Sequence, residues 1–232
     1  MADTDEASTS FAHEAEQDSA AIDRDVAALN PLLRELGVQE EVQILDRFQK
    51  RFSEYRTVDR EVLALAVENT NLKAQRLSFG AAREASDRFK AALDPVLPSL
   101  GANEHCLALG LVSDAVSNLL ELELLQGPHI ASTDDAAMTA IEQTIAALEG
   151  KTAEDLDKLH GLVDPGSLSA AQTALDQFNK IGAQIVTLSR RNSNLRSLDL
   201  SLRVKPPLTT ACDDSARELQ SALANEGSKA TR

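Results

Sequence analysis

Apolar residues recur along this chain at alternating steps of three and four positions, which is the spacing of one face of an α-helix. The series run over residues 22–36, 45–72, 112–148 and 174–202, and a short helix is expected over 210–224. A polar stretch, STDDAAM, interrupts the third series, and its Ser132 or Thr133 is expected to cap a new helix. The pattern predicts long helices rather than strands.

Glycine and proline mark the ends of these series. Gly37 is expected to end the first helix, and a cluster of turn residues around Pro95 separates the second series from the third. Proline inside a helix removes a backbone donor, so we expect the chain to kink or stop at residues 127–128 and 205–207. Gly80 is a further point at which the second helix could divide.

Helical series joined by short turns, with a narrow apolar stripe, are typical of a helix bundle. We therefore expect an all-α protein, an antiparallel up-down-up-down four-helix bundle with long helices that kink at these breaks. The bundle is expected over residues 19–226, between a flexible acidic tail at 1–18 and a flexible tail at 227–232. The breaks leave open whether it forms one module or two stacked modules.

One polar phrase interrupts the apolar stripe twice. NTNLKAQRLSF begins at Asn69 and NSNLRSLDLSL begins at Asn192, and at an offset of 123 the two share five identities in eleven positions. Duplication of a helical hairpin would explain the likeness, and so would shared helical periodicity. The second and fourth helices of such a bundle run parallel, so Asn69 and Asn192 are expected to face each other across the core.

These asparagines have two interpretations. A buried amide without hydrogen bonds costs roughly 1–3 kcal/mol, so the first interpretation is a paired polar layer that fixes the register of the bundle. The second is a small-molecule pocket lined by this layer. Its ligand-binding residues would be Asn69 and Asn192, with Asn71, Asn194, Arg76 and Arg190 near the rim. His129 would join them by a count from the turn near Ser99, which puts it at about the level of Thr70, whereas a count from the turn near Pro165 puts it about two turns away, nearer Ser201. A histidine beside a proline is also a common hydrogen-bonding partner of a helix end.

Composition supports helices and limits the partners. Aromatic residues make up 3% of the 232 residues, there is no Trp, and Gly and Pro are sparse. The net charge of -14 would repel nucleic acid and an anionic membrane surface, so neither is expected as a partner. The apolar runs are far shorter than the ~20 residues of a membrane-spanning helix. No basic and then apolar segment opens the chain, so no secretory signal is visible and we expect a soluble chain.

The stretch FQKRFSEYRTVDREVLALAVENTNLKAQRLS, residues 48–78, resembles the four-helix-bundle ligand-binding domain of bacterial methyl-accepting chemotaxis proteins. Phe52, Tyr55, Arg60 and EVLALA at 61–66 carry the likeness, which extends loosely over residues 18–224. The family implies a periplasmic, extracytoplasmic sensor, commonly a homodimer. Such a sensor binds small solutes such as amino acids or organic acids and passes a small helix displacement through the membrane.

The chain departs from a whole receptor of this family. It lacks the transmembrane helices, the HAMP linker and the long cytoplasmic hairpin, so we expect it to be the sensor portion, with a free-standing soluble relative as the alternative. No family motif marks its ligand-contacting arginines. Arg56 and Arg60, one helical turn apart, are candidates for gripping a ligand carboxylate, because a guanidinium matches its geometry. The alternative is a solvated helix face beside Glu54 and Glu61.

Other chemistry has weaker support in the sequence. Cys106 and Cys212 would reach similar heights on adjacent helices of the bundle, so a disulfide could form in an oxidising compartment. No metal site and no cofactor is expected, because the chain has no Glu-x-x-His pair, haem-attachment motif, GxGxxG or Walker loop. We therefore expect a solute sensor and not an enzyme. The alternatives are an adaptor bundle that recruits a partner helix and a metal-dependent helical enzyme.

Overall fold

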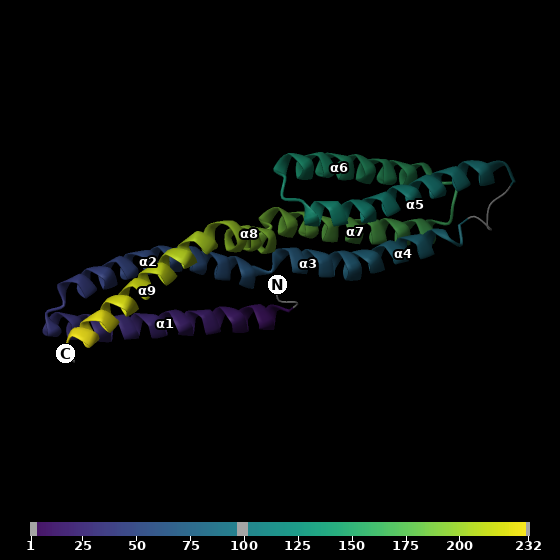
Figure 1. The fold of residues 1–232 in the computed structure, drawn as a ribbon. Coiled ribbons are helices and arrows are strands. Elements are labelled where there is room, and N and C mark those ends of the chain that lie inside the picture. Colours follow the sequence, from purple (N-terminus) through teal and green to yellow (C-terminus); the bar gives the residue numbers. More distant parts are fainter. Residues whose placement is uncertain (1–3, 97–101, 231–232) are drawn as a thin grey trace. The chain divides into compact units, whose positions relative to one another are not determined.

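The structure, a computed structural model, describes residues 4–96 and 102–230. Within these ranges it consists of helices and turns without a strand, so the all-α prediction is confirmed (Figure 1). The chain forms two compact units rather than one bundle over residues 19–226. Unit 1 comprises Met1–Asn69 and Ser193–Arg232, and unit 2 comprises Thr70–Asn192.

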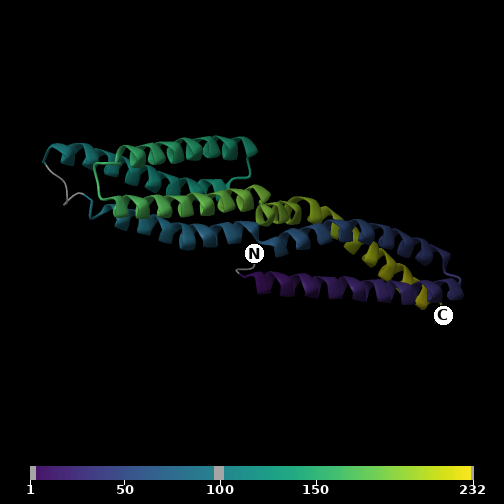
Figure 2. The same ribbon diagram turned by 180° about the vertical axis from the view of Figure 1, so that it is seen from behind.

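Unit 2 packs four helical rods from its described residues. One rod runs through α3 (Thr70–Leu77), the π-helical segment Ser78–Ala82 and α4 (Arg83–Leu93), and the others are α5 (Ala102–Ala131), α6 (Asp135–Lys158) and α7 (Pro165–Arg191). α5 packs against α6 and α7 and also against α3 and α4, and both views show it running beside α6 (Figures 1 and 2). An extensive buried core, including Phe89, Leu119 and Phe178, lies between the rods.

Unit 1 packs three helical rods from its described residues. They are α1 (Asp5–Leu36), α2 (Gln39–Glu68), and a third rod of α8 (Ser193–Asp199), the π-helical segment Leu200–Val204 and α9 (Lys205–Ala230). α2 is central, because α1 and the α8–α9 rod each pack along it but have little contact with each other. The main buried apolar cluster of this unit is small and consists of Leu33, Val42, Ile44, Leu45 and Leu219, and Phe52, Val62 and Leu65 of α2 are also buried.

Both copies of the polar phrase are helix breaks. α2 ends at Asn69 (φ 50°, ψ 38°) and α7 ends at Asn192 (φ 55°, ψ 36°), so each asparagine adopts the left-handed conformation. They are the only non-glycine residues with positive φ among the described residues. Asparagine tolerates this conformation better than most residues, because its short side chain can hydrogen-bond locally. The chain passes from one unit to the other at these two residues, and not at Gly80 or at the prolines.

The correspondence extends beyond the phrase. Each break is followed by a short helix, of 8 residues in α3 and 7 in α8, and then by a five-residue π-helical segment. At the offset of 123, α1 and α2 correspond to α6 and α7, and α4 corresponds to the first part of α9. The backbone therefore repeats as well as the sequence. Within the described residues, α5 has no counterpart in unit 1.

Several helix ends differ from the sequence prediction. Gly37 does end α1 in a left-handed cap, at φ 73°. α5 continues through Pro128 to Ala131, and the cap of α6 is Asp134, whose carboxylate accepts from the backbone N–H groups of Ala136 and Ala137. Asp134 takes this role from Ser132 and Thr133 because a carboxylate also suits the positive end of the helix dipole.

The predicted tails are also helical where the structure describes them. The Thr4 side chain accepts from the backbone N–H of Ala7, and Asp5 and Glu6 occupy the first turn, so α1 begins at residue 5 rather than after residue 18. α9 likewise continues through residues 227–230. No helix among the described residues has both the length and the apolarity to cross a membrane.

Candidate functional site

The four predicted asparagines form two amide pairs, one in each unit. In unit 1, Nδ2 of Asn194 donates to Oδ1 of Asn69 at 2.8 Å. In unit 2, Nδ2 of Asn71 donates to Oδ1 of Asn192, also at 2.8 Å. Each pair joins one copy of the phrase to the other. The expected partners Asn69 and Asn192 are not paired, because the helix breaks put them in different units.

Each helix-breaking asparagine is also tied to a neighbouring segment. Nδ2 of Asn69 donates to Oγ of Ser8 at 2.8 Å and to the carboxylate of Asp5 at 3.0 Å, both in the first turns of α1. Nδ2 of Asn192 donates to the Ser132 carbonyl at 2.9 Å, between α5 and α6. These amides are buried and hydrogen-bonded, so the pairs fit the interpretation of a polar layer that fixes register.

The pair in unit 1 borders open space. A groove of about 290 Å³ runs between α1, α2 and α8, with Asn69 and Asn194 at its border and Phe11, Leu63 and Leu198 among its walls. Asn69 and Asn194 therefore meet one requirement of the pocket interpretation as well. The groove is mostly apolar, so a ligand there would bind mainly through apolar contact.

The pair in unit 2 adjoins a buried polar network around His129. This side chain is 1% exposed, its Nε2 lies 2.8 Å from Oε1 of Glu142, and its Nδ1 lies 2.5 Å from Oγ of Ser189. A carboxylate only accepts hydrogen bonds, so Nε2 carries a proton. His129 is thus a buried hydrogen-bonding residue that joins α5 to α6 and α7.

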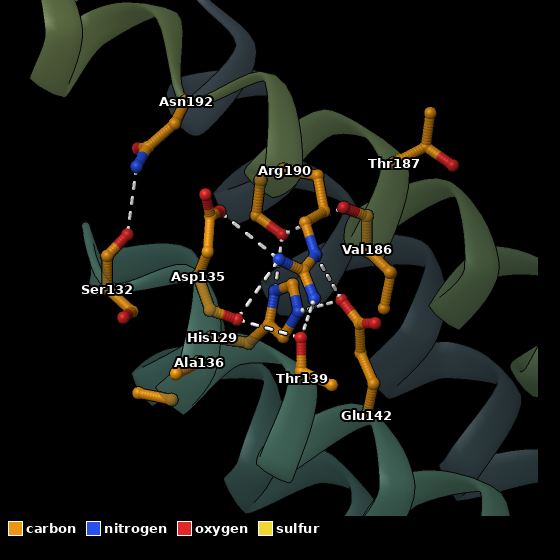
Figure 3. Close-up of polar contacts among 12 residues, drawn as sticks. His129, Ser132, Asp135, Ala136, Thr139, Glu142, Val186, Thr187, Arg190 and Asn192 are labelled. Carbon is orange, nitrogen blue, oxygen red and sulfur yellow. Dashed lines mark hydrogen bonds and ion pairs between the residues drawn. The ribbon is translucent and has the colours of Figure 1, made fainter.

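Arg190 completes this network (Figure 3). Its Nε donates to Oε1 of Glu142 at 2.6 Å, its Nη1 to the carboxylate of Asp135 at 3.2 Å, and its Nη2 to Oγ1 of Thr139 at 2.7 Å. The hydrogen bond from Arg190 lowers the pKa of Glu142, against the opposing effect of burial, and His129 lowers this pKa further. The same bond to Glu142 raises the pKa of Arg190.

Serine, histidine and glutamate stand here in the order of a nucleophilic triad, but substrate cannot reach them. Ser189 is 0% exposed, and its hydroxyl lies 2.8 Å from the Ile185 carbonyl. Beside His129 lies a cavity of about 20 Å³, whose walls include Gln126, Glu149 and Phe178. A cavity of this size holds about one water molecule. The arrangement therefore stabilises the packing of α5 against α6 and α7.

Arg56 and Arg60 lie on a face of α2 that adjoins the groove at Asn69 and faces α1, since Leu63 lines both that groove and one at Arg60. They line two adjoining grooves of about 320 and 260 Å³, together with Asp23 and Thr57 in one and Glu16 in the other. Arg56 forms an ion pair with Asp23, and its guanidinium carbon lies 5.8 Å from the centre of the Phe52 ring. Arg60 is exposed and makes no hydrogen bond or ion pair within the part of the chain that the structure describes.

The other predicted residues do not assemble into a site. Arg76 is exposed in the last turn of α3, outside the amide pairs. Cys106 and Cys212 are free thiols in different units, so the possible disulfide is not formed; the estimate of equal heights assumed one continuous bundle. Burial raises the pKa of the Cys212 thiol. No group of three or more His, Cys, Asp or Glu side chains in the described ranges is placed to hold a metal ion.

Sequence reasoning missed several participating residues. Asp5 and Ser8 were assigned to a tail, although Thr4 followed by acidic residues is a recognisable helix start. Glu142 and Ser189 carry no signal beyond being polar neighbours of apolar positions. The aromatic residues Phe48, Phe52 and Tyr55 could have been recognised from the sequence. They lie at helical spacing, and the chain has only six Phe and one Tyr.

Comparison of the sequence with protein-family models and with curated proteins gives no match in either case.

Proposed function

We propose that this chain is a ligand-sensing domain of chemoreceptor type, in which unit 1 binds a small solute and answers with a displacement of α1. One observation supports this most directly: unit 1 has open grooves along α2, and two of them are lined by Arg56 and Arg60. Regions with few buried contacts are the ones from which binding sites and moving elements are usually drawn.

The proposed solute site is the groove between α1 and α2 that contains Arg56 and Arg60. The exposed guanidinium of Arg60 is available to a carboxylate, and Arg56 is one turn away to complete a two-point contact. Asp23 and Glu16 line the same face and would attract an ammonium group. This combination of charges suits an amino acid better than a simple organic acid.

The hydrogen bonds at Asn69 offer a path for the signal. A solute bound between α1 and α2 would shift α1 along α2, and the first turns of α1 hold Nδ2 of Asn69 through Asp5 and Ser8. Asn69 is the last residue of unit 1 before the chain enters unit 2. A shift of α1 would therefore break these hydrogen bonds of Asn69, and we expect the left-handed break to change from a paired to an unpaired arrangement.

The family resemblance supplies the remaining parts of the proposal. It implies a periplasmic position, attachment to the membrane through segments outside this chain, and a homodimer. It also implies reversible binding without catalysis, with the bundle packing of helices serving signal transmission.

Thermal-shift and calorimetric titration with amino acids and organic acids test the proposal. Binding to the folded state should raise its stability by about 2.7 kcal/mol at a hundredfold excess over Kd. Arg60→Gln should abolish the shift, and Arg83→Gln, an exposed arginine of unit 2, should leave it unchanged. Asn69→Leu should retain binding at the Arg60 groove while losing the displacement of α1, measured by hydrogen exchange in its first turns. Failure of every solute to shift the native chain would contradict the proposal.

A second candidate function is an adaptor that recruits a partner helix. The observation that favours it is a pair of mostly apolar grooves over α2, between α1 and the α8–α9 rod.

A further inference from the structure

We infer that unit 1 contains a vacant helix-binding slot, at the position that α5 fills in unit 2, and that it accepts an amphipathic helix with basic edges from a partner protein. The slot is the channel over α2 between α1 and the α8–α9 rod. Arg60 is not among its lining residues, although Phe52 and Leu63 line both the slot and the grooves at Arg60. Cys212 lines the slot and not those grooves, so it distinguishes binding in the slot from binding at Arg60.

In unit 2, α5 occupies this position and covers the face of α7 beneath it. Phe178 and Ile185 of α7 are 2% and 1% exposed, respectively. They lie with Leu122 and His129 of α5 around the cavity of about 20 Å³. α5 therefore seals this face of α7 almost completely.

The equivalent face of unit 1 is less completely covered, because Tyr55 is half-buried, although Val62 is 7% exposed. At the offset of 123, Phe178, Ile185 and Val186 correspond to Tyr55, Val62 and Leu63 of α2. Tyr55 lines a groove of about 350 Å³, and Val62 and Leu63 line the groove of about 290 Å³ that ends at Asn69. No helix of the described residues takes the place of α5 here.

The walls of the slot correspond as well. Ile22 of α1 lines the larger groove, and its counterpart at the offset of 123 is Ile145 of α6, which lines the cavity beneath α5. On the opposite wall, Cys212 of α9 corresponds to Phe89 of α4, which is 0% exposed. The three rods of unit 1 thus reproduce three sides of the four-rod unit 2, with one rod missing.

The floor of the slot is apolar and aromatic. Phe48, Phe52 and Tyr55 form a stacked row, with ring centres 5.7 and 6.0 Å apart. Nearer Asn69, Phe11 of α1 is 63% exposed at the side of the second groove. Between them, Lys205 lies over the Tyr55 ring and pairs with Asp59, so its charge is balanced within the unit. Aromatic side chains in such grooves are favourable anchors for apolar helix faces.

The length of the slot suits a helix. Its two grooves are lined by α2 residues from Phe48 to Asn69. At about 1.5 Å per residue, these 21 steps span about 30 Å, which is the length of a helix of about 20 residues. A free amino acid would occupy only a small part of such a channel.

Charge favours a basic partner. Asp18 and Asp25 are exposed on α1 at the positions four before and three after Ile22, so they flank the slot on one wall. Asp213 lines the slot on the other wall, where it also pairs with Arg217 at 2.8 Å. A second copy of this chain, with its net charge of -14, would be repelled from this acidic rim, whereas lysines and arginines along the edges of a helix would complement it.

The two cysteines provide a direct test on the full chain. Cys212 lines the slot and is half-buried, whereas Cys106 is exposed in unit 2 and serves as the internal control. Two synthetic peptides are the probes: residues 107–126 of α5, which fills the equivalent position, and the same peptide with Asp114→Lys, Glu121→Lys and Glu123→Lys. The rate of maleimide labelling is followed at each cysteine by mass spectrometry.

The lysine-substituted peptide should slow labelling of Cys212 about tenfold when its concentration is about tenfold above Kd, and it should leave Cys106 unaffected. The native acidic peptide should bind more weakly, and added salt should weaken the lysine-substituted one. Ala66→Phe, which places a ring in the slot, should remove the protection, whereas Ala146→Phe on the exposed face of α6 should not. Circular dichroism confirms that both variants remain helical.

Three results would overturn the inference. One is unchanged labelling of Cys212 with either peptide. Another is equal protection of Cys106 and Cys212, which would indicate nonspecific association. The third is protection of Cys212 when the protein concentration alone is raised, because a second copy of the chain would then occupy the slot.

Discussion

Asn69 and Asn192 have the same backbone conformation and equivalent amide pairs, yet their surroundings differ. Asn192 adjoins the buried network of His129, Glu142 and Arg190, whereas Asn69 borders a groove of about 290 Å³. The break itself is therefore common to both units. What differs is the presence of α5, which covers one copy and has no equivalent at the other.

The same difference separates the two cores. Unit 2 has an extensive cluster of buried apolar residues, whereas the corresponding cluster of unit 1 has five. Since burial of apolar area is the main stabilising contribution to folding, unit 2 should be the more stable of the two. The repeated framework thus gives one unit with a large core and one unit with a smaller core and open grooves.

The largest effect that would sharpen this comparison is expected at Phe178 and its counterpart Tyr55. Phe178→Ala should lower the free energy of unfolding of unit 2 by about 3–5 kcal/mol, because it leaves a cavity in a closed core. Tyr55→Ala should cost unit 1 far less, since the ring is only half-buried in an open groove. Urea titration with native-state hydrogen exchange measures both. Equal losses would show that the slot is covered in solution.

A smaller effect is expected in the network that only unit 2 possesses. Glu142→Gln should destabilise the protein by about 1–3 kcal/mol at neutral pH, because the ionic acceptor of Arg190 and His129 is lost. The pKa of Glu142 is lowered from 4.5 in the folded state, so its contribution is complete above the unfolded value and disappears as the pH falls below about 4.5. The variant should therefore lose less stability than the native chain on acidification.

Glu149 provides a control, because its pKa is shifted in the opposite direction to the pKa of Glu142. Burial raises its pKa, so its ionisation opposes folding, and Glu149→Gln should stabilise the protein at neutral pH. Chemical denaturation from pH 3 to 7 compares the two variants. The assignment of the network would fail if both showed the same pH dependence.

The two breaks should respond alike to changes in the backbone. At either Asn69 or Asn192, alanine should be about 1–2 kcal/mol less stable than glycine, because an L-residue with a Cβ is disfavoured in the left-handed conformation. Both substitutions remove the amide, so their difference isolates the backbone. Thermal unfolding of the four variants gives it. Alanine being the more stable choice would mean that the helix can run straight through the phrase.

The smallest effect on stability is expected at Arg60. Arg60→Gln should change the free energy of unfolding by less than about 0.5 kcal/mol, since the side chain is exposed and unpaired within the described residues. Its effect should appear in solute affinity instead. A loss of binding without a loss of stability would assign Arg60 to the ligand, whereas loss of both would make it structural.

The sequence predicted the class of fold but not the positions of the two breaks, which were expected at Gly80 and at the prolines. Periodicity identified the helices, and Gly37 ended α1 as expected. The apolar stripe continues from Leu65 across Asn69 to Leu72, so it indicates an unbroken helix. Only the tolerance of asparagine for positive φ hints at the break, and that tolerance is too common to decide a conformation.

The site was harder to predict because its contacts join distant segments. The repeated phrase was correctly singled out, but pairing Asn69 with Asn194 and Asn71 with Asn192 requires knowing that the chain divides there. His129 was placed near this layer by counting along helices, while its partners Glu142 and Ser189 come from two other helices. Such partners follow from packing, which local patterns do not determine.

The discontinuous composition of unit 1 has a consequence for synthesis of the chain. Residues 70–192 form unit 2 as one uninterrupted segment, whereas unit 1 needs segments from both sides of it. As the chain leaves the ribosome from its N-terminus, unit 2 can complete its core before α8 and α9 emerge. Until then the helical hairpin of α1 and α2 has no third rod to pack against, and its aromatic row is accessible to chaperones and to any partner present at that time.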